Sequence, residues 1–270
     1  MSMTRILKSR WIHDCGEGAV IWHLAFTPSG TLVGQKRFAE DRQALFFTID
    51  PLSGSVYVAG WVAVDPVQGA VIGEGWFAGI ETVHQQLVYI HSWQDASPEH
   101  RGIWAFDPVK GEVRWSRPEF VFSANTPGGL LVYRIVFFAG LPERRYALLD
   151  PLRGTLVEGG DIAAEEALLL QRGAETEEQR QGVLLPEMDP QSGGGREWML
   201  LEGICVEGLH RTDRDGGWQS SLRIVESGTL LYEDAMESGS SKPLWNNFLV
   251  RGGDLYYIRN KRELVCVPLR

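Results

Sequence analysis

The stretch "FFTIDPLSGSVYVAGW", residues Phe46 to Trp61, contains the turn sequence that decides the fold. The pattern Asp-Pro-x-x-Gly at its centre occurs five times in the chain, beginning at Asp50, Asp65, Asp107, Asp150 and Asp189. With 13 Pro and 31 Gly in 270 residues, chance would supply far fewer than one copy. The pattern is therefore a repeated structural unit.

Each copy predicts a reversal of the chain between two strands. Proline holds φ near the value needed at the first corner of a type I turn. The Asp before it can accept hydrogen bonds from N–H groups two or three residues further on, and the final Gly adopts a left-handed conformation at little cost. Runs of β-branched and aromatic residues flank three of the copies, so we expect hairpins at residues 50–54, 107–111 and 150–154.

The spacing of the turns predicts the architecture. From Asp65 the steps to the next three copies are 42, 43 and 39 residues. A period near 40 with short strands is typical of β-propeller blades. We therefore expect an all-β fold, a β-propeller of about six antiparallel blades, with five or seven also possible. Residues 20–270 would form this single domain, and residues 1–19 an N-terminal extension with a ring-closing strand around residues 5–12.

One segment leaves two interpretations open. Residues 161–172 are rich in Ala, Glu and Leu, which favour a helix. The repeat nevertheless requires a fourth blade at this point. We therefore expect a strand at Ala167–Gln171, opposite Val183–Leu185.

The segment "AFDPVKGEVRW", Ala105 to Trp115, resembles the tryptophan-docking repeat of quinoprotein-type propellers, A-x-D-x-x-x-G-x-x-x-W. The resemblance implies that Trp115 packs between neighbouring blades. It also implies that the turn positions Asp50, Gly54, Asp107, Gly111, Asp150 and Gly154 are structural. Residues 76–115 further resemble a bacterial propeller-like family of unknown function. Quinoprotein dehydrogenases carry adjacent cysteines beneath their cofactor, and because this chain has no Cys-Cys pair we expect no cofactor.

Composition excludes several classes of partner. A net charge of −9 argues against nucleic acid, which is bound by clustered Lys and Arg. No segment approaches 18 uninterrupted apolar residues, and no apolar run follows the basic N-terminal residues. Three widely separated cysteines form no disulfide framework. We therefore expect a cytoplasmic protein without a membrane partner.

The sequence "HSWQDASPEHRG", residues 91–102, contains the candidate binding residues His91, Trp93, Asp95 and His100. Histidines and carboxylates can bind a metal or transfer protons. The spacing of nine between the two histidines matches neither a helical nor a hairpin ligand pair. A solvated polar loop is therefore the simpler interpretation, and we expect no metal.

Three functional hypotheses remain open. The first is a non-catalytic propeller that binds a protein or a small molecule. The second is a metal-dependent hydrolase or lyase with carboxylate, Asn or His side chains in the central channel, for which Asn246, Asn247 and Asp254 are candidates. The third is a small-ligand sensor with a Trp-lined pocket. No Gly-x-Ser-x-Gly or phosphate-loop sequence is present, so we expect no catalytic residue.

Overall fold

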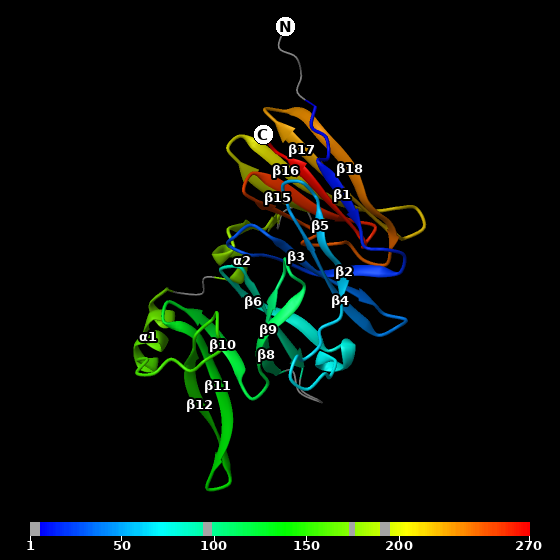
Figure 1. Cartoon of the computed structure of the whole chain (residues 1–270). Helices are drawn as coiled ribbons and strands as arrows, with labels where there is room; N and C mark the ends of the chain where they lie inside the picture. The colour runs from blue at the N-terminus through cyan, green and yellow to red at the C-terminus, as the bar shows by residue number, and fades with distance from the viewer. Residues whose placement is uncertain (1–5, 94–98, 173–175, 190–194) are drawn as a thin grey trace. The chain divides into compact units, whose positions relative to one another are not determined.

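The computed structural model describes residues 6–93, 99–172, 176–189 and 195–270, which form two compact units (Figure 1). Unit 1 comprises residues 1–21, 52–54 and 178–270, and unit 2 comprises residues 22–51 and 55–177. Antiparallel sheets make up most of both units, which confirms the expected all-β class. No described helix is both long and apolar enough to cross a membrane.

Three sheets form unit 2. Four strands make the first, in the order β2 (Ala19–Phe26), β3 (Leu32–Phe38), β4 (Gln43–Ile49) and β5 (Val56–Trp61). Four more make the second, β6 (Ala78–His84), β7 (Leu87–Trp93), β8 (His100–Asp107) and β9 (Glu112–Arg117). The third contains β10 (Val121–Thr126), β11 (Gly129–Phe138) and β12 (Leu141–Leu149). A short 3₁₀ segment, η1 (Ile72–Gly75), precedes β6.

The middle sheet of unit 2 is buried on both faces. Val88 and Ile90 on β7 share a core with Val33 and Phe46 of the first sheet. The alternate residue Tyr89 joins a different core, with residues of the third sheet. Successive side chains of a strand point to opposite faces, so each face of β7 packs against a different neighbouring sheet. Burial on both faces explains why β7 begins as a continuous apolar run.

Three of the Asp-Pro-x-x-Gly turns share one hydrogen-bond pattern. Asp107 Oδ1 accepts hydrogen bonds from the N–H groups of Val109 and Lys110, at 3.2 and 3.1 Å. The carboxylates of Asp65 and Asp150 make the same contacts with the residues two and three positions on. The closing glycines have positive φ, +76° at Gly54, +67° at Gly69, +72° at Gly111 and +67° at Gly154. The Asp189 copy extends into residues 190–194, outside the described part of the chain.

Apolar side chains pack against three of these glycines, a tryptophan in two cases and a valine in the third. In unit 2, a Cβ on Gly154 would lie 2.5 Å from the ring of Trp115, whose Nε1 donates to the Pro151 carbonyl at 3.1 Å. In unit 1, a Cβ on Gly54 would lie 2.6 Å from Trp11. The equivalent distance from Gly111 to Val58 is 3.1 Å. Glycine is therefore required at these turns both by the backbone conformation and by the side chain packed on it.

Two five-stranded sheets form unit 1. One has the order β1 (Trp11–Asp14), β21 (Glu263–Pro268), β20 (Asp254–Arg259), β19 (Phe248–Arg251) and β13 (Val183–Leu184). The other has the order β14 (Glu187–Met188), β15 (Arg196–Leu201), β16 (Ile204–Thr212), β17 (Trp218–Glu226) and β18 (Thr229–Ser240). Residues from both sheets, including Val206, Ile224, Leu255 and Val265, share one apolar core.

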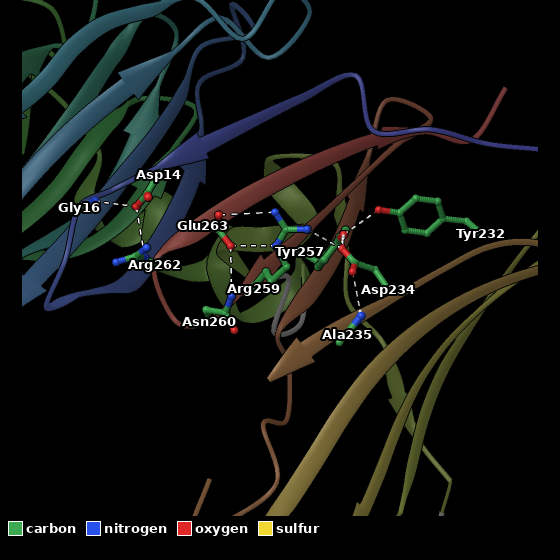
Figure 2. A network of polar contacts seen from close by, with 10 residues as sticks. All are labelled: Asp14, Gly16, Tyr232, Asp234, Ala235, Tyr257, Arg259, Asn260, Arg262 and Glu263. Atoms are coloured by element: carbon green, nitrogen blue, oxygen red, sulfur yellow. Dashed lines mark hydrogen bonds and ion pairs between the residues drawn. The ribbon is translucent and has the colours of Figure 1, made fainter. Parts of the chain in front are cut away.

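A polar network joins the two sheets of unit 1 at one edge (Figure 2). Arg259 on β20 contacts Asp234 on β18 at 3.0 Å and Glu263 on β21 at 2.8 Å. The Tyr257 hydroxyl donates to the same Asp234 carboxylate and lies 2.8 Å from the Tyr232 hydroxyl. These hydrogen bonds pair the charges, and Asp234 ties β18 to β20.

Three local expectations need correction. Residues 162–172 form a helix, α1 (Ile162–Arg172), not a strand. Its first turn is capped by Asp161, which accepts a hydrogen bond from the Ala164 N–H at 3.0 Å, so local helix propensity decides this segment. β13 pairs instead with β19.

The other two corrections concern strand limits. The N-terminal strand, β1, covers residues 11–14 and pairs with β21, whereas a strand around residues 5–12 was expected. Only an isolated bridge, between Leu149 and Leu156, follows the Asp150 turn where a second hairpin strand was expected. A second short helix, α2, spans Glu177–Arg180.

Candidate functional site

The structure brings together three of the four candidate binding residues, at one end of the middle sheet of unit 2. His91 and Trp93 belong to β7 and His100 begins β8. A solvated loop was expected for these three residues, and they lie on strands instead. His91 is 4% exposed. Antiparallel pairing sets Trp93 opposite His100, and His91 lies two residues along β7 on the same face. Asp95 lies outside the described residues.

A fourth residue, Glu81, completes the cluster from β6. The register of β6 and β7 shifts between Ile80 and Thr82, so Glu81 is the extra residue of a β-bulge. A bulge redirects a side chain that regular pleating would point elsewhere. The Nδ1 atom of His100 lies 2.6 Å from Glu81 Oε2. The only sequence signal for Glu81 is a carboxylate inside the mostly apolar stretch "AGIETV".

Aromatic packing fixes the two histidine rings. The rings of His91 and His100 stack with their centroids 3.5 Å apart and an interplanar angle of 12°. Trp93 packs edge-on against both, with centroid separations of 5.3 Å to His91 and 4.3 Å to His100. The three aromatic rings therefore restrain one another, which limits the rotamers open to the site.

Gly79 on β6 provides the space that His91 occupies. A Cβ at Gly79 would lie 2.5 Å from His91 Nε2. The other ring nitrogen, Nδ1, lies 3.3 Å from the Ser92 carbonyl. A hydrogen bond from Nδ1–H to a carbonyl leaves Nε2 with its lone pair available, which is the arrangement commonly found in metal-binding histidines.

The environment keeps His91 neutral. Burial, together with the neighbouring charges of His100, His23 and Arg37, lowers the pKa of His91 to about 3. Neutral imidazole is the form that binds metal ions. The side chain of His100 is 31% exposed, so the cluster is open to solvent on that side.

The donor atoms of Glu81, His91 and His100 lie within 4.8 Å of one another, close enough for one metal ion to bridge them. Zn–N bonds of about 2.0–2.1 Å would hold two ligand nitrogens about 3.3 Å apart in a tetrahedral site. An ion would replace the proton shared by Glu81 and His100 and widen their 2.6 Å contact. The lone pairs lie in the ring planes, so the stacked imidazoles would have to rotate out of parallel.

A cavity of about 300 Å³ borders the cluster within unit 2. Trp93 lines it together with Arg101, Trp104 and Asp65. The Trp104 indole donates to Asp65 Oδ2 at 2.6 Å. Burial alone would raise the pKa of Asp65, but hydrogen bonds from Trp104 and from the N–H groups of Gln68 and Val67 outweigh it and hold the pKa below its usual value.

The channel candidates of unit 1 are not brought together as a ligand set. Asp254 Oδ2 lies 2.6 Å from the Arg10 guanidinium. Asn246 has a left-handed backbone, with φ at 56°, and its N–H donates to the buried carboxylate of Glu197. Among the described residues, Glu81, His91 and His100 are the only group of three or more such ligands close enough to share a metal.

A search of curated proteins found no match. The solved structures similar to the chain include the following two. A Mycobacterium tuberculosis puromycin-hydrolyzing peptidase shares 14% identity, with a TM-score of 0.24 over 90% of this chain and 34% of its own. The AfRom2 CNH domain shares 10% identity, with a TM-score of 0.29 over 98% of this chain and 99% of its own. The chain thus spans about a third of the length of the peptidase. Residues 27–115, which include the whole cluster, match the family described as Domain of unknown function (DUF4905).

Proposed function

We propose that the chain is a non-catalytic binding module of the β-propeller type, and that Glu81, His91 and His100 hold a divalent transition-metal ion in it. The convergence of these three side chains from three adjacent strands carries the proposal. Two imidazoles and one carboxylate suit Zn²⁺, Ni²⁺ or Cu²⁺ better than Mg²⁺ or Ca²⁺, which prefer oxygen ligands alone. The −9 charge is consistent with a cationic ligand and opposes nucleic acid.

Two features support the propeller architecture. Neighbouring sheets of unit 2 share cores through opposite faces of the middle sheet. The glycines of three Asp-Pro-x-x-Gly turns, Gly54, Gly111 and Gly154, each lie against an apolar side chain. Five sheets are present in the described residues. We propose that these sheets are blades of one ring.

Zinc titration of metal-stripped protein tests the site directly. Isothermal calorimetry should show one Zn²⁺ per chain and no heat with Mg²⁺. His91→Ala and His100→Ala should each abolish the high-affinity binding. His84→Ala is the matched control, because His84 also lies on the middle sheet but contacts Asn125 at 3.2 Å, outside the cluster. Zinc binding that is absent from the parent protein, or that survives both cluster substitutions, would contradict the proposal.

A second pair of variants tests the geometry without removing a ligand. Gly79→Ala adds one methyl group 2.5 Å from His91 Nε2 and must displace that ring. Gly60→Ala is the control, because its Cβ would meet its nearest neighbour, Leu45 Cδ1, at an ordinary 3.4 Å. Displacing a supporting contact of a metal ligand typically costs about 10–100-fold in affinity. We expect that loss for Gly79→Ala and an unchanged zinc affinity for Gly60→Ala.

Metal-dependent hydrolysis is the second candidate function. Three protein ligands leave a fourth position on the ion, which zinc hydrolases fill with water, and the exposed side of His100 leaves room for it. Hydrolysis of nitrophenyl esters and phosphodiesters by the zinc-loaded protein measures this function. Turnover that disappears in His100→Ala would favour an enzyme, whereas stoichiometric zinc binding without turnover would favour the binding module.

A further inference from the structure

The hairpin formed by β11 and β12 ends in an exposed apolar tip. Eight consecutive apolar residues, 135–142, cover the ends of both strands and their connection. Phe137 is 76% exposed, Phe138 65% and Leu141 69%. Figure 1 shows this end of the hairpin extending beyond the other strands of unit 2. Large aromatic side chains this exposed are unusual on a soluble surface and indicate a binding site.

The tip is apolar on both faces of the hairpin. Phe137 pairs with Pro142 and Phe138 pairs with Leu141, and neighbouring pairs along a ribbon point to opposite faces. A protein partner normally covers one face of a ribbon and leaves the other in water. An environment that surrounds the tip, such as the interface of a lipid bilayer, would cover both faces at once.

Arginines form a collar behind the tip. Arg134 pairs across the hairpin with Arg145, and Arg144 lies opposite Ile135. Residues 134–145 contain three Arg and one Glu, so the hairpin carries +2 within a chain of −9. Glu99 offsets part of this charge, because it lies 3.4 Å from the Arg144 guanidinium. Four residues of strand place Arg145 about 13 Å behind Leu141, a distance that long arginine side chains shorten by reaching towards the tip.

The backbone of the tip limits how deeply it can enter a membrane. β10 pairs with β11 only as far as Tyr133, so among the described residues the hairpin is two-stranded beyond that point and its outer edges have no sheet partner. Unpaired N–H and C=O groups are costly in hydrocarbon. The connection itself is tight, since Ala139 and Gly140 both have positive φ, at 51° and 84°. The tip is therefore suited to shallow insertion, with its side chains in the acyl boundary and its backbone among the headgroups.

We propose that the β11–β12 tip binds the surface of an anionic phospholipid bilayer, with Phe137, Phe138 and Leu141 inserted and the arginine collar against the lipid phosphates. The composition of the whole chain predicted no membrane partner. The hairpin differs locally from that composition, because it combines an apolar tip with a net positive charge. One apolar tip and a weak cationic collar together give reversible binding, because neither signal alone anchors a protein. The proposal does not depend on the metal site.

Vesicle co-sedimentation of the full chain tests the proposal. We expect binding to mixed phosphatidylserine–phosphatidylcholine vesicles and weak binding to phosphatidylcholine alone. Phe137→Ser/Phe138→Ser should lower the partition coefficient at least about tenfold on both, since it removes the inserted side chains. Arg144→Gln/Arg145→Gln should lower it only on the mixed vesicles, by about fivefold for each arginine.

Two controls keep the outcome decisive. Leu52→Ser is the matched control, because Leu52 is also 72% exposed but belongs to a different turn. It should leave binding unchanged, and all variants should keep the parent melting temperature. No sedimentation with either vesicle, or sedimentation that the phenylalanine substitutions leave intact, would overturn the proposal. Self-association through the tip without vesicle binding, detected by light scattering and lost in Phe137→Ser/Phe138→Ser, would also overturn it.

Discussion

Substituting Gly154 by alanine measures how much the side chain docked on an Asp-Pro-x-x-Gly turn contributes to stability. Gly69 provides a matched reference, since it closes the same turn sequence in the same unit with the same φ of +67°. A Cβ at Gly69 would have no neighbour within 4 Å, whereas a Cβ at Gly154 would lie 2.5 Å from Trp115. Both substitutions therefore carry the same free-energy cost of a left-handed backbone, and only Gly154→Ala also displaces a docked ring.

The expected magnitudes follow from these two contributions. A left-handed conformation costs a residue with a Cβ about 1–2 kcal/mol, and this cost applies to both variants. Carbon atoms normally approach to about 3.5–4.0 Å, so Trp115 must move by at least about 1 Å in Gly154→Ala. Overpacking of this kind costs about 1–3 kcal/mol. We expect Gly154→Ala to be destabilised by about 2–5 kcal/mol and Gly69→Ala by about 1–2 kcal/mol.

Urea unfolding gives the free energies, and both glycines lie in unit 2, so the same transition reports on both. A double-mutant cycle then isolates the ring. In a Trp115→Ala background, Gly154→Ala should cost no more than Gly69→Ala costs in the parent chain. Equal destabilisation by the two glycine substitutions, or an unchanged Gly154→Ala cost in the Trp115→Ala background, would refute the docking argument.

Three further predictions concern buried groups. Trp104→Phe removes the hydrogen bond to the Asp65 carboxylate and should lower the free energy of unfolding by about 1.5–3 kcal/mol at neutral pH, as measured with urea. The folded-state pKa of Asp65 lies below its usual value, so the difference in unfolding free energy between parent and variant should persist above about pH 4. Below that pH the difference should shrink as acid protonates the carboxylate. A difference that grows below pH 4 would contradict this prediction. Cys266 is buried, which raises its pKa to about 12, whereas Cys205 is only half-buried. Peptide mapping after brief iodoacetamide treatment should therefore find Cys205 modified before Cys266. Modification of Cys266 before Cys205 in the folded protein would contradict this prediction.

The turns and most strands were predictable because their causes are local. Proline, Asp and Gly act on the backbone within five residues, and the flanking β-branched residues favour extension whatever surrounds them. The same reasoning applies to α1, where Ala, Glu and Leu residues and the Asp161 cap make a helix. The strand expected at Ala167–Gln171 was wrong because this local helix preference outweighs the period of the repeated turns.

Only some residues of the candidate site could be predicted from the sequence. His91, Trp93 and His100 stood out as a group, but the spacing of nine between the histidines predicted a loop. The structure makes them cross-strand neighbours, since β7 and β8 extend to these residues. Glu81 and Gly79 were missed because their roles depend on a bulge and on a neighbour across the sheet.

The sequence alone determined the all-β class, the repeated turns and the residue types that could bind a metal, since each of these follows from local backbone preference or side-chain chemistry. Only the tertiary structure decided that β13 joins β19, that Trp11 and Trp115 pack on turn glycines, and that Glu81 meets two histidines. These contacts join residues far apart in the chain or on different strands. Strand register and sheet packing create such contacts, and neither can be read from the spacing of residues along one chain.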